Sequence, residues 1–226
     1  MRWVLSAPDP LTAVNGALFP ALLAAFVIGS ASAGSVTAGT VTFVSPCECQ
    51  GQKSGTRWPV KTDPSPVPLD KSTIQSVTPS QICEWKGPAP NEPLTPETDT
   101  RIPAEQKWYN LTGRLDSVKV EADGDITLVL KDAEGKKAGS VGAEIPVGSI
   151  WCELRQTVFG WTTQSFPFSF KESQKLEIRE QHIITVTGKA FFDVQHVSAD
   201  NSNQRAKSKK YAVWEIHPVM AMHVDQ

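Results

Sequence analysis

Apolar and polar residues alternate with a period of two through much of the C-terminal half of the chain, as in strands that bury one face. The segment 182–196, HIITVTGKAFFDVQH, is the clearest case, and a second runs through 211–224, YAVWEIHPVMAMHV. One face of the first segment collects Ile184, Val186, Gly188, Ala190, Phe192 and Val194. We predict two long strands here, with a bend at Gly188, since glycine inside a strand often marks a barrel corner.

The same alternation predicts three earlier strands and one helix. Residues 111–120 and 126–131 form a hairpin around the turn 122–125, and 142–146 is a short third strand. Residues 151–161 predict a helix, and 164–180 has no regular pattern. Three strands, a helix and two strands is the order of an OB-like five-stranded β-barrel, which we expect over 106–226. An open β-sandwich is the alternative.

A proline-rich segment precedes this domain. Eleven of the 17 prolines lie between positions 46 and 103. Proline lacks the amide donor, so neither a long helix nor a central strand can pass through this region. Its tryptophans and isoleucines predict an extended arm, residues 34–105, that lies on the barrel. Thr78 followed by Pro79 indicates the start of one short helix.

The N-terminus resembles an export signal. Arg2 precedes an apolar run that begins at Gly16, and the run ends before Ala31-Ser32-Ala33, a small-x-small cleavage site. We expect a signal peptide over 1–33, a periplasmic or secreted protein, and no membrane span in the mature chain. An uncleaved anchor is the alternative, although the run is shorter than the ~20 residues that a span needs.

The predicted export places the four cysteines in an oxidising compartment. An even number in an oxidising compartment predicts two disulfides, in which Cys47 and Cys49 each pair with Cys83 or Cys152. A Cys-x-Cys metal clip is the alternative, but it lacks a second pair of ligands at the usual spacing.

Charge limits the partners of the protein. The chain has 22 basic and 24 acidic residues, a net charge of -2, so it has no overall attraction to polyanions. A local basic loop is nevertheless present between the last two strands, where OB-folds grip oligonucleotides or oligosaccharides. Its candidate ligand-binding residues are Arg205, Lys207, Lys209, Lys210 and Tyr211. A protein ligand, or a loop that is simply solvated, is also consistent with this composition.

Two acidic residues and two histidines near the last strands form a candidate metal site: Asp193, His196, Glu215 and His217. Glu215 and His217 are two residues apart, so they share the face opposite Trp214. Two imidazoles and two carboxylates suit a divalent transition metal or acid–base work. The alternative is structural, with the carboxylates accepting hydrogen bonds at strand ends. No catalytic residue is assigned, and no cofactor is predicted beyond a possible divalent metal.

The turn Asp123-Gly124-Asp125 has a simpler explanation. Aspartate and glycine are the residues that a tight hairpin turn requires. Together with Glu121 they also offer alternating oxygen ligands, so calcium binding is the alternative.

Five blocks in order resemble a family of exported bacterial proteins of unknown function: WPVKT from Trp58, EADGDI from Glu121, EIP from Glu144, FFD-x-x-H from Phe191 and E-x-HPV from Glu215. The resemblance covers about residues 55–224 and implies no activity. A weaker resemblance, to staphylococcal-type thermonucleases, rests on Asp123-Gly124-Asp125 alone, since their catalytic arginines and glutamate have no counterparts.

These patterns favour an exported binding or interaction module of unknown ligand over an enzyme. Nucleophile elbows, phosphate loops and dinucleotide fingerprints are missing from the sequence. The alternative function is a metal-dependent hydrolase, for instance of phosphodiesters, that uses the four candidate metal ligands.

Overall fold

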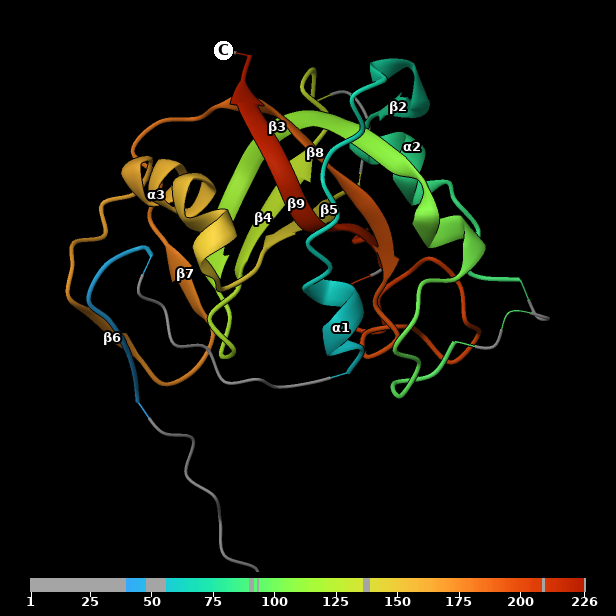
Figure 1. Ribbon diagram of the computed structural model, residues 1–226, viewed down its shortest axis with the longest axis horizontal. Helices are drawn as coiled ribbons and strands as arrows, with labels where there is room; N and C mark the ends of the chain where they lie inside the picture. The colour runs from blue at the N-terminus through green and yellow to red at the C-terminus, as the bar shows by residue number, and fades with distance from the viewer. Residues whose placement is uncertain are drawn as a thin grey trace, which may run out of the picture. The chain divides into compact units, whose positions relative to one another are not determined.

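Five strands in the described part of the chain close into a β-barrel (Figure 1). The computed structural model describes residues 40–47, 56–89, 92, 94–135, 139–208 and 210–225. The barrel strands are β3 (Trp108–Val120), β4 (Ile126–Lys131), β5 (Val141–Ile145), β8 (Ile183–Phe192) and β9 (Trp214–Val224). They pair in the order β3-β4-β5-β9-β8, and β8 pairs back with β3. This confirms the predicted all-β, OB-like barrel.

The long first strand makes closure possible. The N-terminal part of β3 pairs with β8, and its C-terminal part pairs with β4. The register of β3 against β4 shifts between Leu115 and Ser117, a bulge that increases the local bend. The barrel therefore closes because one curved strand is shared by its two sides. The β5–β9 contact is parallel, and the other barrel pairs are antiparallel.

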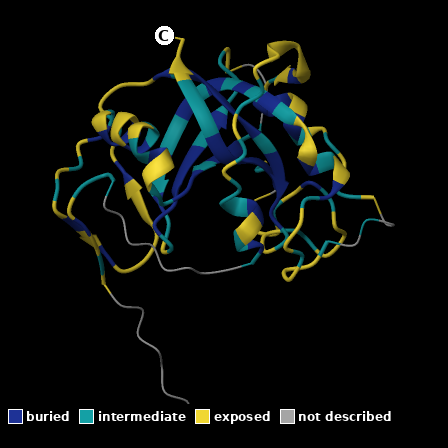
Figure 2. Cartoon of the chain, in the orientation of Figure 1, coloured by how far each residue is buried: buried dark blue, intermediate teal, exposed yellow. Residues whose placement is uncertain are grey.

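The apolar residues predicted to face inward form the core of the barrel, and its strands are largely buried or partly buried (Figure 2). Inward-facing side chains that are fully buried include Leu111, Leu115, Val118, Leu128, Leu130, Ala143, Ile184, Val186 and Ile216. Trp214 joins this core and stacks edge-on against Phe192, with ring centroids 5.1 Å apart. Burial of this apolar surface is the main force that stabilises the barrel.

The predicted bend at Gly188 is a double shift in the register of β8 against β9. Gly188 lies opposite Val219, and Ala190 lies opposite Ile216, so β9 has an extra residue around the cis peptide that precedes Pro218. A Cβ on Gly188 would lie 2.3 Å from the Pro218 carbonyl oxygen. Only glycine allows the two backbones to approach this closely.

Helix α3 (Cys152–Gly160), preceded by the 3-10 turn η3 (Ser149–Trp151), matches the predicted helix between the third and fourth barrel strands. Val158 and Phe159 are buried in the core. Arg155, also fully buried, donates to the carbonyl oxygens of Ile145 and Gly124 at 3.2 and 3.0 Å. The guanidinium thus satisfies backbone acceptors where barrel strands end.

The proline-rich segment contains more regular structure than the predicted extended arm. It forms α1 (Trp58–Lys61), η1 (Lys71–Thr73), β2 (Ile74–Val77), α2 (Pro79–Cys83) and η2 (Pro103–Gln106). The cap of α2 is as predicted, because the Thr78 side chain accepts from the Gln81 amide while Gln81 reaches back to the Thr78 amide. β2 pairs in parallel with the start of β3, at the edge of the sheet. These elements are short, and the prolines within them lie in the first turn of a helix, where no amide donor is needed.

Residues 164–180, predicted to be irregular, contain two short strands. β6 (Phe168–Phe170) pairs with β1 (Val41–Phe43), and β7 (Gln174–Leu176) pairs with the end of β3. The aromatic rings of Phe43 and Phe170 lie 4.9 Å apart, centroid to centroid. Three-residue strands depend on partners far along the chain, so local alternation does not reveal them.

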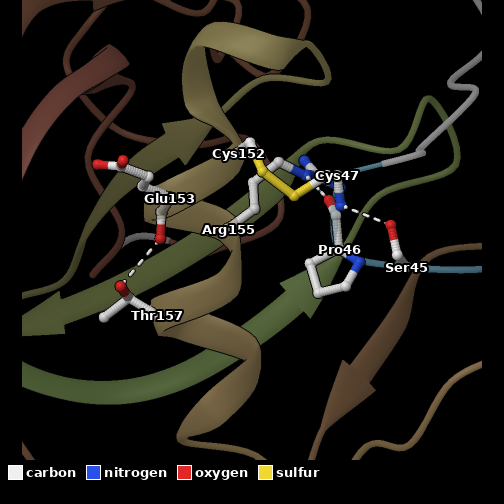
Figure 3. Close-up of a disulfide and its surroundings, with 7 residues drawn as sticks. All are labelled: Ser45, Pro46, Cys47, Cys152, Glu153, Arg155 and Thr157. Atoms are coloured by element: carbon white, nitrogen blue, oxygen red, sulfur yellow. Dashed lines mark hydrogen bonds between the residues drawn. A yellow bond between two sulfur atoms is a disulfide. The ribbon is translucent and has the colours of Figure 1, made fainter.

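One predicted disulfide is present, between Cys47 and Cys152 (Figure 3). It ties the segment after β1 to the first residue of α3, beside the hydrogen bond from Arg155 to the Pro46 carbonyl oxygen. Cys49 lies outside the described residues, and Cys83 has no disulfide partner among those described. The second disulfide stays a prediction.

The predicted signal peptide, residues 1–33, also lies outside the described residues. Within the described ranges, none of the helices has the length and apolar character needed to cross a membrane.

Candidate functional site

A polar cleft of about 260 Å³ lies on the outer face of β4 and β5. One wall is the β3–β4 turn with Glu121 and Asp123, and the opposite wall is the β8–β9 loop with Asp193, His196 and Arg205. In OB-folds this strand face and these two loops are the usual place for ligands. The cleft therefore has the right location for a binding site.

The floor of the cleft is a ladder of acidic and hydroxyl groups. Thr127 of β4 lies opposite Glu144 of β5 and donates to it at 3.1 Å. The same hydroxyl lies 2.9 Å from Glu121, which also accepts from Ser173 and pairs with Lys119 at 2.9 Å. Cross-strand pairing thus fixes the position of Glu144, and side-chain contacts fix that of Glu121.

Arg205 holds the β8–β9 loop against β9. Its Nη2 lies 2.9 Å from Glu215 and 3.4 Å from Asp193, and its Nε donates to the Ala212 carbonyl oxygen at 3.0 Å. The guanidinium also stacks 4.3 Å above the Tyr211 ring. Asp193 in turn contacts Nδ1 of His196. Arg205 is therefore a structural cation, with 13% of its side chain exposed.

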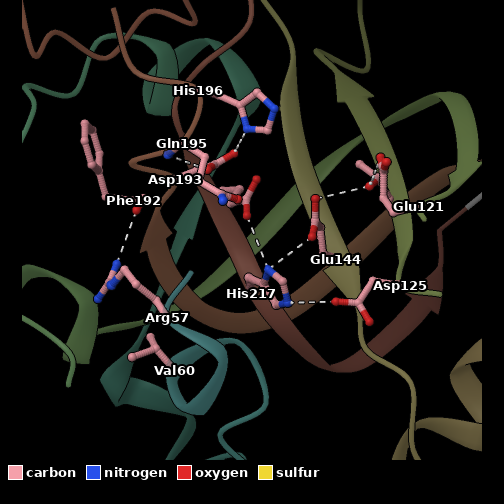
Figure 4. Close-up of polar contacts among 12 residues, drawn as sticks. Arg57, Val60, Glu121, Asp125, Glu144, Phe192, Asp193, Gln195, His196 and His217 are labelled. Atoms are coloured by element: carbon pink, nitrogen blue, oxygen red, sulfur yellow. Dashed lines mark hydrogen bonds and ion pairs between the residues drawn. The ribbon is translucent and has the colours of Figure 1, made fainter. Parts of the chain in front are cut away.

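His217 is fully buried beside three carboxyl groups (Figure 4). Its Nδ1 lies 3.2 Å from Glu144 and 3.3 Å from Glu215, and its Nε2 lies 3.6 Å from Oδ2 of Asp125. Asp125 comes from the β3–β4 turn, where its Oδ1 accepts from the Val147 amide at 3.0 Å. Three separate parts of the barrel therefore meet at one imidazole.

Burial perturbs the acid–base behaviour of this cluster. It raises the pKa of Glu144 and of Glu215 to about 7, and a neighbouring carboxylate adds to each shift. It also raises the pKa of Asp125 well above its usual range and lowers the pKa of His217 to about 4. Near neutral pH the imidazole of His217 is therefore neutral, and Glu144 and Glu215 are each partly protonated.

Helix α1 covers this cluster and supplies a cation. Burial opposes the charge of Lys61, but Glu144, Glu215 and Asp193 together raise the pKa of its ammonium. The ammonium lies 5.7 Å from the ring centroid of Phe191, and that ring lies 5.3 Å from the ring of His217. The segment before the barrel thus turns an exterior face of β8 and β9 into a buried one.

The four predicted metal residues meet in this region but do not surround one point. Asp193 and His196 contact each other at the mouth of the cleft, while Glu215 and His217 lie beneath. Arg205 stands between Asp193 and Glu215. A guanidinium there would repel a divalent ion shared by all four. The predicted facing of Glu215 and His217, opposite Trp214, agrees with the structure.

The predicted ligand-binding residues fall into two groups, one that lines the cleft and one that does not. Arg205 and Tyr211 line the cleft. Lys207 and Lys210 are exposed outside the cleft lining, and Lys209 lies outside the described residues. The ligand-binding role of this loop stays a prediction. Its arginine contacts carboxylates, and the cleft lining has four acidic residues, Glu121, Asp123, Glu144 and Asp193.

Sequence reasoning missed Asp125, Glu144 and Lys61 as members of the cluster. Alternation does place Glu144 on the outer face of its strand, between Ala143 and Ile145. The parallel pairing of β5 with β9 brings it next to His217, and that pairing joins distant segments. The sequence predicts Asp125 as a turn residue, with calcium binding beside Glu121 and Asp123 as the alternative, and neither prediction pairs it with His217.

Comparisons of the chain with models of protein families, with curated proteins and with solved structures found no match.

Proposed function

We propose that the protein is an exported binding module that holds a small polar ligand in the cleft on β4 and β5. The observation that supports this proposal is the position of the cleft, where both the β3–β4 turn and the β8–β9 loop contribute to its walls. Its volume of about 260 Å³ suits a small molecule or one unit of a longer chain.

The charge of the lining favours hydroxyl-rich or cationic ligands. Carboxylates accept hydrogen bonds from sugar hydroxyls and from ammonium groups. The three basic residues of the lining, Lys61, Lys119 and Arg205, all interact with carboxylates. A nucleic acid would bring further negative charge into this acidic cleft, so it is the disfavoured partner.

The test is calorimetry with neutral oligosaccharides, polyamines and short oligonucleotides. We expect binding from one of the first two groups, with at least about tenfold loss in Glu121→Gln, since a charged hydrogen bond contributes ~1.5–3 kcal/mol. Glu177→Gln, outside the cleft, is the matched control. Oligonucleotide binding with a steep salt dependence, or sugar and polyamine binding that Glu121→Gln leaves unchanged, would contradict the proposal.

Export is the part of this proposal that rests on the N-terminal sequence and on the disulfide. Disulfides persist mainly in oxidising compartments. Expression of the whole chain in a bacterial host, followed by fractionation and N-terminal sequencing, should yield a periplasmic or secreted protein that begins near Gly34. A full-length chain in the cytoplasmic fraction would contradict it.

A metal-dependent hydrolase is the second candidate function, and the buried His217 among carboxyl groups is the observation that favours it. Hydrolysis of a chromogenic phosphodiester, measured with and without added Mn²⁺ or Zn²⁺, tests this candidate. Turnover that requires metal and is lost in His217→Ala would support it. Absence of turnover would leave the binding module as the proposed function.

A further inference from the structure

Two buried polar atoms face each other below the cleft without a hydrogen-bond partner among the described residues. They are Nε2 of His217 and Oδ2 of Asp125, on side chains with 0% exposure. Their separation of 3.6 Å is too long for a hydrogen bond. Buried polar groups are nearly always satisfied, so this pair points to a group that binds between them.

The surroundings of the imidazole determine which nitrogen is available. Nδ1 hydrogen-bonds to Glu215 at 3.3 Å, and this carboxyl group favours a proton on that nitrogen. Glu144 lies 3.2 Å from Nδ1, and among the described contacts it makes no hydrogen bond to the imidazole. Nε2 then has its lone pair directed toward Asp125. A carboxylate that orients a histidine through its other nitrogen is the usual second-shell arrangement of metal sites.

The separations fit a common ion. Two ligands each ~2.1 Å from one metal are ~3.6 Å apart when the angle between them is about 120°. One ligand atom each from Asp125, Glu144 and His217 lies within 4.8 Å of the others. Three ligands at that bond length in one plane are ~3.6 Å apart, so the carboxylates have to move toward the imidazole when the ion binds.

We propose that Asp125, Glu144 and His217 bind one divalent transition metal ion, Zn²⁺ or Mn²⁺. One imidazole nitrogen and two carboxylate oxygens are the mixed donor set that these ions accept, whereas Ca²⁺ and Mg²⁺ prefer oxygen ligands alone. Glu215 orients the histidine and Lys61 is a competing cation. This site goes beyond the proposed binding function and needs no cleft ligand.

The position of Glu144 relates the ion to the cleft. Glu144 lines the cleft and has 13% of its side chain exposed, while Asp125 and His217 are closed off beneath it. Three protein ligands leave further coordination positions open. The ion is therefore accessible from the cleft past Glu144.

Direct metal binding by the purified full chain tests the site. After treatment with EDTA, the protein is dialysed against ZnCl₂, MnCl₂, CaCl₂ or MgCl₂ and its metal content is measured, and affinities are determined by calorimetry. We expect one Zn²⁺ or Mn²⁺ per chain, a higher melting temperature with that ion, and no comparable effect of Ca²⁺ or Mg²⁺.

Conservative variants identify the ligands. Asp125→Asn keeps an oxygen for the Val147 amide, and Glu144→Gln keeps one for the Thr127 hydroxyl, so both should fold. Each should weaken metal binding at least about tenfold, since even second-shell changes cost 10–100-fold. Lys61→Met should strengthen binding, and Asp193→Asn, the control from the other carboxylate group, should leave it unchanged.

Two results would overturn the site. The first is a metal content below 0.1 ion per chain, an order-of-magnitude threshold for a site without real affinity. The second is binding that Asp193→Asn abolishes and Asp125→Asn preserves. Because no ligand or substrate is added, these results are independent of the outcome for the proposed function.

Discussion

The Arg57–Glu105 ion pair should be one of the most sensitive points of the fold. Both side chains are buried, with exposed fractions of 1% and 0%. Two parallel contacts of 2.7 Å join the guanidinium to the carboxylate. Glu105 also accepts from the backbone amides of Phe192 and Ile102, so it connects the N-terminal segment to the end of β8.

Glu105→Gln removes the negative charge and retains the size of the side chain. Arg57 would then keep its carbonyl acceptors, those of Thr98, Thr100 and Phe192, but no counter-charge. Breaking a buried pair in this way costs about 3–5 kcal/mol. For a protein of this size the melting temperature should fall by roughly 6–20 °C.

Urea unfolding followed by tryptophan fluorescence measures the loss. The matched control is Asp116→Asn, which breaks the Lys131–Asp116 pair of 2.8 Å between side chains that are 41% and 32% exposed. That change should cost less than about 1 kcal/mol. Combined with Arg57→Met, Glu105→Gln should cost less than the sum of the two single changes, because no unpaired charge remains. A loss below about 1 kcal/mol for Glu105→Gln alone would refute the reasoning.

Three further changes test other parts of the fold. The Cys47–Cys152 disulfide spans 105 residues, so replacing both cysteines with serine should lower the free energy of unfolding by up to about 4.7 kcal/mol. A reductant should destabilise the native protein and leave the stability of this serine variant unchanged. His196 donates a hydrogen bond from Nδ1 to the Asp193 carboxylate, which raises the pKa of the imidazole, so Asp193→Asn should lower that pKa in an NMR titration. The stabilisation in the native protein is complete below about pH 6.5 and is lost as pH rises through the higher folded pKa, and an unchanged pKa would contradict this. Gly188→Ala should cost more than about 2 kcal/mol in urea unfolding because its Cβ has no space, whereas Gly160→Ala, in a helix with open space, should stabilise by about 0.5–1 kcal/mol; equal effects would contradict the close approach at the bulge.

The barrel could be predicted because apolar residues recur at every second position along its strands. In β8, Ile184, Val186 and Ala190 are buried as the period of two requires. The sequence also indicated the bend at Gly188 and the cap of α2, since both depend on local backbone geometry. Local rules are sufficient for such features because the residues involved are neighbours in the chain.

Contacts between distant segments could not be predicted in the same way. β1 and β6 are short strands that exist through their pairing with each other. Glu144 and His217 meet only because β5 lies parallel to β9. Arg205 has the sequence context of a solvated basic loop, yet Glu215 and Asp193 neutralise it. Each of these features depends on pairing between strands or loops whose partner residues cannot be identified from the local sequence pattern.

The N-terminal segment explains why the polar face of β9 is buried at all. In an isolated barrel, Glu215 and His217 would face solvent on the outside of the sheet. Arg101 instead donates to the carbonyl oxygens of Ala190 and His217 at 2.8 Å each, across the bulge, and α1 lies over the same face. Loosening this segment with Glu105→Gln should therefore accelerate amide hydrogen exchange in residues 213–219 as well as lower the overall stability. Uniform acceleration across all barrel strands would instead show that the segment and the barrel unfold as one unit, and that the burial of His217 is inseparable from the global fold.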